Sequence, residues 1–186
     1  MKLNIGCGLN REAGYLNLDK YTACGPDQVM DAEAFPWPFA DSSVEAVLFN
    51  HSLEHMGRDP DLFLRLMQEL YRVCRGGATV QINAPHPRHD DFLNDPTHVR
   101  VITPDLMTLF SRRQCESWAK TGGANSPFAL YLDVDFELRR VQSVLDPAYQ
   151  QAYDSGQIND AQLQRMEHSQ NNVVREIRIT LEAIKA

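Results

Sequence analysis

Two glycines and two aspartates lie near the start of the sequence, each after a short apolar run. Gly6 and Gly8 follow KLNI, Asp19 ends YLNL, and Asp31 follows QVM. Glycine lets a ligand approach the backbone without a Cβ in the way. A carboxylate at the end of a strand can accept hydrogen bonds from both hydroxyls of a ribose. Asp19 therefore suits a ribose and Asp31 an adenine edge, which predicts an adenosine-containing ligand.

The spacing of these residues disfavours a dinucleotide. A dinucleotide fingerprint has a third glycine, and its acid comes about 20 residues later. Here Gly8 is followed by Leu9, Asn10 and Arg11, and Asp19 comes only eleven positions after it. A crossover with its helix needs at least about 10–12 residues, so the first helix should be very short or absent. Without it little would hold a pyrophosphate, and a ligand lacking phosphate fits better.

The elements that would position these residues alternate between strands and helices. Asp59 can cap a helix that begins at Pro60, carries apolar residues at helical spacing, and ends at Arg75 before a Gly-Gly pair. A second helix should run from Pro104 to about Arg113. Strands are expected at 2–5, 15–18, 28–30, 44–49, 78–83, in one or two pieces of 129–145, and at 173–184, with loop at 119–127 and a polar helix at 158–170. This order predicts an α/β, doubly wound, mostly parallel sheet with an antiparallel edge.

The bulk composition limits the partners and the location of the chain. Its 186 residues are expected to form a single domain, 1–186, and carry a net charge of −7, which disfavours nucleic acid as a partner. The four cysteines are widely spaced without a C-x-x-C pair, so neither disulfides nor a zinc site is expected. No signal segment or membrane span is apparent. These features favour a reducing, cytoplasmic location.

Three longer segments resemble one family of enzymes. LNIGCG…GYLNLD, DAEAFPWPFADSSVEAVLFNHSLEHM and ELYRVCRGGATVQINAPH are similar, in order, to the motifs of class I S-adenosylmethionine-dependent methyltransferases, and most of all to the small type 11-like group. The resemblance covers about residues 2–85. It implies a Rossmann-like, seven-stranded sheet, S-adenosylmethionine as cofactor, and methyl transfer as the reaction. Asn10 stands where the family commonly has a third glycine, and Arg75 where it has a proline.

The resemblance also implies roles for individual residues. Gly6, Cys7 and Gly8 would pass under the methionine moiety of the cofactor. Asp19 would hold the ribose hydroxyls with Lys20 beside it, while Asp31 would accept from the adenine amino group and the Ala32 backbone would meet a ring nitrogen. Asn50 and His51 would line the methionine end and the exit of the methyl group. Cys7 is expected to be packed rather than reactive, and His55 to cap or pack beside its strand.

The segment 86–103 is rich in histidine and aspartate and follows the fifth predicted strand. It could be a solvated loop or lid over the substrate. Alternatively, it could supply a general base, His98 or His86, beside His51 as a further catalytic candidate, because histidine titrates near working pH and Asp95 could orient it. A divalent metal site is a third reading, but the residues lack a strict ligand spacing, so no metal is predicted.

The acceptor of the methyl group is not readable from the sequence. The chain reads NHSL after the fourth strand rather than an N-P-P-Y-type motif, which together with the acidic charge favours a small-molecule, sugar or lipid-linked acceptor over DNA. The chain could form a homodimer, or a protein partner could supply a recognition domain for the acceptor. Two rival readings stay open: a nucleotide-binding oxidoreductase, and a non-catalytic protein of this fold that binds the cofactor or a partner.

Overall fold

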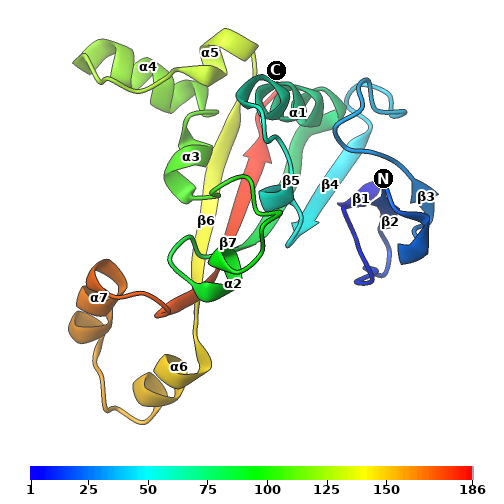
Figure 1. Ribbon diagram of the computed structural model, residues 1–186. Helices are drawn as coiled ribbons and strands as arrows, with labels where there is room; N and C mark the ends of the chain where they lie inside the picture. Colours follow the sequence, from blue (N-terminus) through cyan, green and yellow to red (C-terminus); the bar gives the residue numbers. More distant parts are fainter. Residues whose placement is uncertain (186) are drawn as a thin grey trace.

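A computed structural model describes residues 1–185 and contains one seven-stranded sheet with the order β3-β2-β1-β4-β5-β7-β6 (Figure 1). Strands β1 to β5 pair in parallel, whereas β7 pairs antiparallel with both β5 and β6. The strands are β1 (Lys2–Ile5), β2 (Leu16–Asp19), β3 (Gln28–Val29), β4 (Val44–Asn50), β5 (Cys74–Pro85), β6 (Phe136–Leu145) and β7 (Val174–Ala183). The predicted doubly wound sheet with an antiparallel C-terminal edge is confirmed.

Helices are concentrated in the second half of the chain. They are α1 (Pro60–Val73), α2 (Asp90–Leu93), α3 (Pro104–Thr108), α4 (Arg112–Thr121), α5 (Phe128–Leu132), α6 (Pro147–Asp154) and α7 (Asp160–Ser169), with short 3₁₀ turns η1 (Thr22–Cys24) and η2 (Leu53–His55). Helices α6 and α7 extend away from the rest of the chain, beyond one end of β6 and β7 (Figure 1). Among the described residues, no helix combines the length and the apolar character needed to cross a membrane.

The connection between β1 and β2 contains no helix, as the short spacing predicted. Residues 9–14 form turns, and β1 still pairs in parallel with β2. Only η1 lies between β2 and β3. The N-terminal half of the sheet is therefore left without the crossover helices that usually cover a parallel sheet.

Helix α1 begins as predicted but ends earlier. The side chain of Asp59 accepts a hydrogen bond from the Asp61 amide, and Pro60 occupies the first turn. The predicted end at Arg75 is wrong, because Cys74 is already extended and pairs with Val44 in the sheet. The buried face of α1 packs against the sheet through Phe63, Leu66, Met67, Leu70 and Val73.

The region after β5 differs most from the prediction. The single helix expected from Pro104 to Arg113 is broken at 109–111, because Ser111 caps the separate helix α4. That helix includes residues expected to be loop, and α5 occupies residues expected to belong to a strand. Helix α6 was not expected at all, whereas α7 and β7 confirm the predicted polar helix and final strand.

Glu69 on α1 is expected to contribute stability that depends on pH. It accepts from both Nε and one Nη of Arg72, at 2.9 and 2.7 Å, and from the Trp37 amide at 2.5 Å. The hydrogen bonds from Arg72 lower the pKa of Glu69 although burial opposes them. The stability that Glu69 contributes is complete above its pKa in the unfolded chain, about 4.3. It is lost as the pH falls through the lower pKa that Glu69 has in the folded protein.

Glu69→Gln should therefore lower the free energy of unfolding by roughly 1.5–3 kcal/mol at pH 7, and by less near pH 3. Urea unfolding at the two pH values measures both. Glu45→Gln is the control, because its ion pair with Arg75, at 3.2 Å, is more than a third exposed on both sides and should contribute under about 1 kcal/mol. An equal effect of both substitutions would contradict this expectation.

Candidate active site

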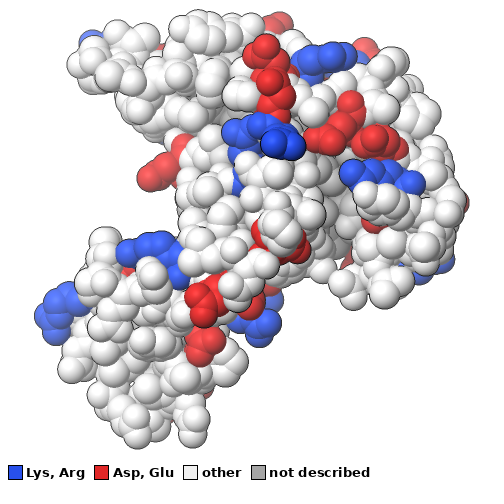
Figure 2. Space-filling view, in the orientation of Figure 1, with Lys and Arg blue, Asp and Glu red and all other residues white. Residues whose placement is uncertain are grey.

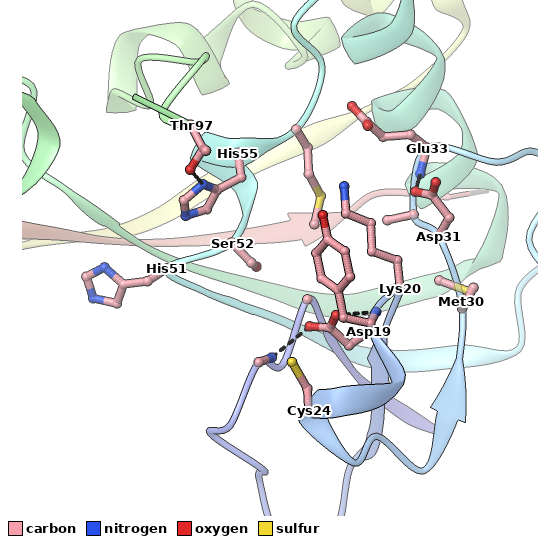
Figure 3. A pocket seen from close by; sticks show the side chains of 15 residues that line it. Asp19, Lys20, Cys24, Met30, Asp31, Glu33, His51, Ser52, His55 and Thr97 are labelled. Atoms are coloured by element: carbon pink, nitrogen blue, oxygen red, sulfur yellow. Dashed lines mark hydrogen bonds between the residues drawn. The ribbon is translucent and has the colours of Figure 1, made fainter. Parts of the chain in front are cut away.

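A cleft of about 420 Å³ lies beyond the carboxyl ends of the parallel strands (Figure 3). Its lining comes from the segments that follow β1, β2, β3 and β4, and from Thr97. In open α/β sheets ligands bind at this edge. The volume lies within the roughly 300–1,000 Å³ that is usual for small-molecule sites.

The turn after β1 is held by side chains from β2 and from the segment after β4. Gly6 and Gly8 both have positive φ, +67° and +52°. The Gly8 amide donates to Oδ2 of Asp19 at 2.8 Å, while the hydroxyl of buried Ser52 donates to the Ile5 carbonyl at 2.7 Å. The turn therefore presents its backbone to the cleft in a fixed position. The sequence pattern did not identify the role of Ser52.

Gly6→Ala should destabilise the protein more than Gly8→Ala. A Cβ on Gly6 would lie 2.7 Å from Cβ of Ser52, whereas one on Gly8 would meet open space. In both variants the left-handed backbone lowers the free energy of unfolding by about 1–2 kcal/mol. Only Gly6→Ala loses a further amount, about 1–3 kcal/mol, through overpacking. Chemical unfolding of both variants measures the difference. Equal losses would show that Ser52 can move aside.

Asp19 and Lys20 lie where β2 enters the cleft. The Asp19 side chain is buried and its Oδ1 accepts from the Tyr21 amide at 2.9 Å, so both carboxylate oxygens are already oriented by backbone amides. Each oxygen keeps a further lone pair for a ligand hydroxyl. Lys20 is exposed, with its ammonium 5.3 Å from the centre of the Tyr21 ring.

Asp31 lies on the far side of the cleft, opposite His51 and His55 (Figure 3), and the next residue, Ala32, also lines the cleft. Oδ1 of Asp31 accepts from the Glu33 amide at 2.9 Å and leaves Oδ2 for a ligand. The carbonyl of buried Ala32 accepts from the indole of Trp37 at 3.0 Å, which fixes the turn. Oε1 of Glu33 accepts from the Gly57 amide at 2.7 Å and ties this side of the cleft to the segment after β4.

Cys7 is packed beneath the glycine turn. The residue is 3% exposed, and its thiol donates to the Gly8 carbonyl at 3.4 Å. Burial, followed by the nearby Asp19 carboxylate, raises the pKa of the Cys7 thiol. The uncharged thiol is a poor nucleophile. All four cysteines of the chain are free.

His51 lies on the cleft wall and is supported by Glu176 of β7. It has positive φ, +51°, and its Nε2 lies 2.5 Å from Oε2 of Glu176. Burial would raise the pKa of Glu176, but hydrogen bonds from Arg178 and His51 lower it. Because this carboxylate can only accept, Nε2 carries the hydrogen, and neutral His51 has a free lone pair on Nδ1.

Four of the predicted site residues lie outside the cleft lining, namely Cys7, Asn50, His86 and His98. Oδ1 of Asn50 accepts from Nδ2 of Asn83 on β5 at 2.9 Å, so this side chain is engaged within the sheet edge. His86 accepts at Nδ1 from the Arg88 amide at 3.1 Å, and burial, with the charge of Arg88, lowers its pKa. Neither the Asn50 nor the His86 side chain contacts the glycine turn through a hydrogen bond among residues 1–185.

His98 packs against His55, which lines the cleft with Thr97. The two imidazole centres are 4.6 Å apart. Burial, and then the neighbouring His98, lowers the pKa of His55. Glu54, next to His55, is fully buried, and burial raises the pKa of its carboxyl. The sequence analysis assigned no role to Glu54, although it lies in a segment that carries the family resemblance, and none to Glu176, which lies outside those segments.

Comparison with known proteins agrees with this geometry. Residues 3–82 match the family model described as a methyltransferase domain. No curated protein matches the sequence. Among solved structures, a SAM dependent methyltransferase from Archaeoglobus fulgidus has a TM-score of 0.61 and 17% identity, covering 97% of this chain and 85% of that one.

Two further solved structures share the fold at low identity. A SAM-dependent methyltransferase from Methanosarcina mazei has a TM-score of 0.55 and 13% identity over 100% of this chain and 92% of its own. The cyclase SpnF has a TM-score of 0.54 and 14% identity over 100% of this chain and 75% of its own. Residues 3–82 therefore match the methyltransferase domain model, and the chain as a whole has the fold of solved S-adenosylmethionine-dependent methyltransferases.

Proposed function

We propose that this chain binds S-adenosylmethionine in the cleft and transfers its methyl group to a small-molecule, sugar or lipid-linked acceptor. The observation that carries the proposal is the Gly6–Gly8 turn, which is tied to Asp19 and faces the cleft. The ribose would bind Asp19, the adenine would lie beside Asp31 and Ala32, and the methionine moiety would cross the glycines toward His51. A cofactor without phosphate does not need a helix N-terminus after β1, and no helix lies between β1 and β2.

The apolar part of the lining suits an adenine ring. Cys24, Met30, Ala32 and Met56 contribute it, with the Met56 side chain close to Gly6. Methionine side chains adapt to flat rings and contact them favourably. Oδ2 of Asp31 would then accept from the exocyclic amino group, which fixes the orientation of the ring.

The methyl group would leave toward His51. In an in-line transfer the bond between sulfur and methyl breaks, the acceptor atom bonds to the methyl carbon, and the sulfonium becomes a neutral thioether. A hydroxyl or ammonium acceptor must also lose a proton, which Nδ1 of His51 would take. Glu176 would stabilise the resulting imidazolium through Nε2. Orientation of the two reactants would supply much of the remaining rate.

The segment 86–103 is proposed to cover the acceptor as part of a single catalytic domain, 1–186. Two backbone hydrogen bonds support this placement, from Val99 and Arg100 to the carbonyl of Glu54, at 2.9 and 3.0 Å. They hold the segment beside the cleft, where Thr97 joins the lining.

A small-molecule or glycan-type acceptor is preferred to nucleic acid. Lys and Arg are scattered among Asp and Glu on the face seen in Figure 2, without an extended basic surface there, and the chain is acidic overall. Binding of a phosphate backbone depends on clustered basic residues.

The free cysteines are consistent with the cytoplasmic location that we propose. A homodimer or a protein partner could add contacts to the acceptor.

A transfer assay with methyl-labelled S-adenosylmethionine tests the reaction. Pools of hydroxyl- and amine-bearing metabolites, sugars and lipid-linked sugars would be offered as acceptors, with release of S-adenosylhomocysteine as the readout. We expect at least one pool to raise the release above that of the protein alone. Binding of the cofactor without transfer to any pool would favour the second candidate function.

The second candidate is a protein of this fold that binds S-adenosylmethionine or a partner without transferring the methyl group. The connections between β1, β2 and β3 contain no α-helix, and a partner could cover this part of the sheet. The similarity to the cyclase SpnF also means that the fold alone does not define the reaction.

A further inference from the structure

Glu54 is a buried carboxyl group without a protein partner. Its exposed fraction is 0%, and neither carboxylate oxygen has a hydrogen-bond donor among residues 1–185. Burying an unpaired carboxylate is costly, so such groups are paired, protonated or bound to a metal ion. The surroundings of Glu54 decide between these possibilities.

His98 directs a free lone pair into the same region. Its side chain is 8% exposed, and Nδ1 lies 2.8 Å from the Phe92 carbonyl. A carbonyl only accepts, so Nδ1 carries the hydrogen and Nε2 of the neutral ring has a free lone pair. Nε2 lies 3.9 Å from Oδ2 of Asp95. An ionised Asp95 carboxylate has no hydrogen to donate to this lone pair.

His55 is held in the same tautomer by a short chain of hydrogen bonds. The hydroxyl of Thr97 donates its hydrogen to Oδ1 of Asp95 at 2.6 Å. It must therefore accept from Nδ1 of His55, 2.9 Å away. Neutral His55 is left with a free lone pair on Nε2. Hydrogen bonds from metal-bound histidines to carboxylates and carbonyls are the usual means of fixing this tautomer.

With Glu54 ionised, the region gathers electron-pair donors and no hydrogen lies between them. Nδ1 of His51, also without a hydrogen, lies 3.8 Å from Oε1 of Glu54. A cation would satisfy Glu54, His55 and His98 at once and leave Nδ1 of His51 free. Ligand atoms of Glu54, His55 and His98 lie within 4.8 Å of one another.

We propose that Glu54, His55 and His98 form a binding site for one divalent first-row transition metal ion. Two imidazoles and one carboxylate suit Mn²⁺, Co²⁺ or Zn²⁺ rather than Mg²⁺ or Ca²⁺. Bonds of about 2.0–2.2 Å to a single ion place the ligand atoms no more than about 4.4 Å apart. Small side-chain movements therefore complete the site.

The site is built by two segments that the backbone binds together. The amides of Val99 and Arg100 donate to the carbonyl of Glu54, which brings His98 beside the segment after β4. The ring of Phe92 stacks on His98 with the centres 5.2 Å apart. Spacing along the sequence could not reveal this site, because His98 is separated from the other two ligands by helix α1 and strand β5.

The position of the ion suggests its use, and this step rests on the proposed methyl transfer. His55 and Thr97 line the cleft on the side opposite Asp31. Three protein ligands leave positions open for an acceptor oxygen. A bound ion would orient that oxygen and lower its pKa, with His51 close enough to take the proton. The site therefore selects an acceptor with a hydroxyl group that can coordinate the ion.

Titration of tag-free protein with Co²⁺ tests the site. We expect one equivalent to bind, with visible d–d absorption bands, and to be displaced by Zn²⁺. Glu54→Gln and His98→Asn should each weaken Co²⁺ at least about 100-fold, since even outer-shell changes cost roughly 10–100-fold. His86→Asn, on the same segment but outside the cluster, should not. Circular dichroism confirms that each variant is folded.

Two results would overturn the site: no saturable binding by the unaltered protein, or the same affinity in Glu54→Gln and His98→Asn as in the control. The first would mean that Glu54 is kept neutral by a proton instead. Asp19→Ala separates this proposal from the proposed function. It should lose S-adenosylmethionine and keep Co²⁺, whereas His98→Asn should lose Co²⁺ and keep S-adenosylmethionine.

Discussion

Asp19→Ala is expected to weaken the binding of S-adenosylmethionine at least about 100-fold. The carboxylate would accept from both ribose hydroxyls, and hydrogen bonds to charged groups contribute roughly 1.5–3 kcal/mol each, where about 1.4 kcal/mol is tenfold in affinity. The substitution also frees the Gly8 and Tyr21 amides that Asp19 now holds. Both the ligand contact and the shape of the glycine turn are then lost.

Calorimetric titration of the variant with S-adenosylmethionine measures this loss. Asp105→Ala is the matched control, since Asp105 is an exposed aspartate in the first turn of α3, outside the cleft. Asp19→Asn should lie between the two, because it keeps one accepting oxygen. Unchanged affinity in Asp19→Ala would exclude the ribose contact proposed for this carboxylate.

His51→Asn is expected to lower the turnover of an acceptor that must lose a proton by about 10²–10⁴-fold. Asparagine tolerates the left-handed backbone of this position, so the substitution removes the imidazole with little strain. Affinity for S-adenosylmethionine should change little, because Asp19 and Asp31, the proposed ribose and adenine contacts, lie apart from His51 (Figure 3). The expected result is a change in turnover rather than in binding.

Release of S-adenosylhomocysteine, followed with an acceptor found by the transfer assay, measures this effect. Glu176→Gln should reduce turnover less, because it weakens the support of the imidazolium and leaves the base in place. His86→Asn should have no effect, since its ring lies outside the cleft lining. If His86→Asn were as slow as His51→Asn, the base would have been assigned to the wrong histidine.

The N-terminal half of the fold was predictable because its signals are local. Short apolar runs end at glycine or aspartate, Asp59 and Pro60 mark a helix start, and the spacing from Gly8 to Asp19 leaves room for at most a very short helix. Helix ends were less predictable, since Cys74 leaves α1 to pair with Val44. Pairing in a sheet can override the helical pattern of a sequence.

The site could be predicted only where its residues follow strands along the chain. Gly6, Asp19 and Asp31 come together because parallel strands end at one edge. Glu176 approaches His51 from an antiparallel strand 125 positions later, and Glu54 meets His98 through backbone contacts of an irregular segment. Neither pairing has a fixed spacing, so only the three-dimensional structure reveals it.

Calorimetric titration of the unaltered chain with S-adenosylmethionine and S-adenosylhomocysteine, with NAD as a control ligand, would test the cofactor site most directly. We predict selective binding of both sulfur nucleotides in the micromolar range and none of NAD, because the turn after β1 lacks the helix N-terminus that a pyrophosphate needs. Failure to bind either sulfur nucleotide, or preference for NAD, would contradict the proposed function.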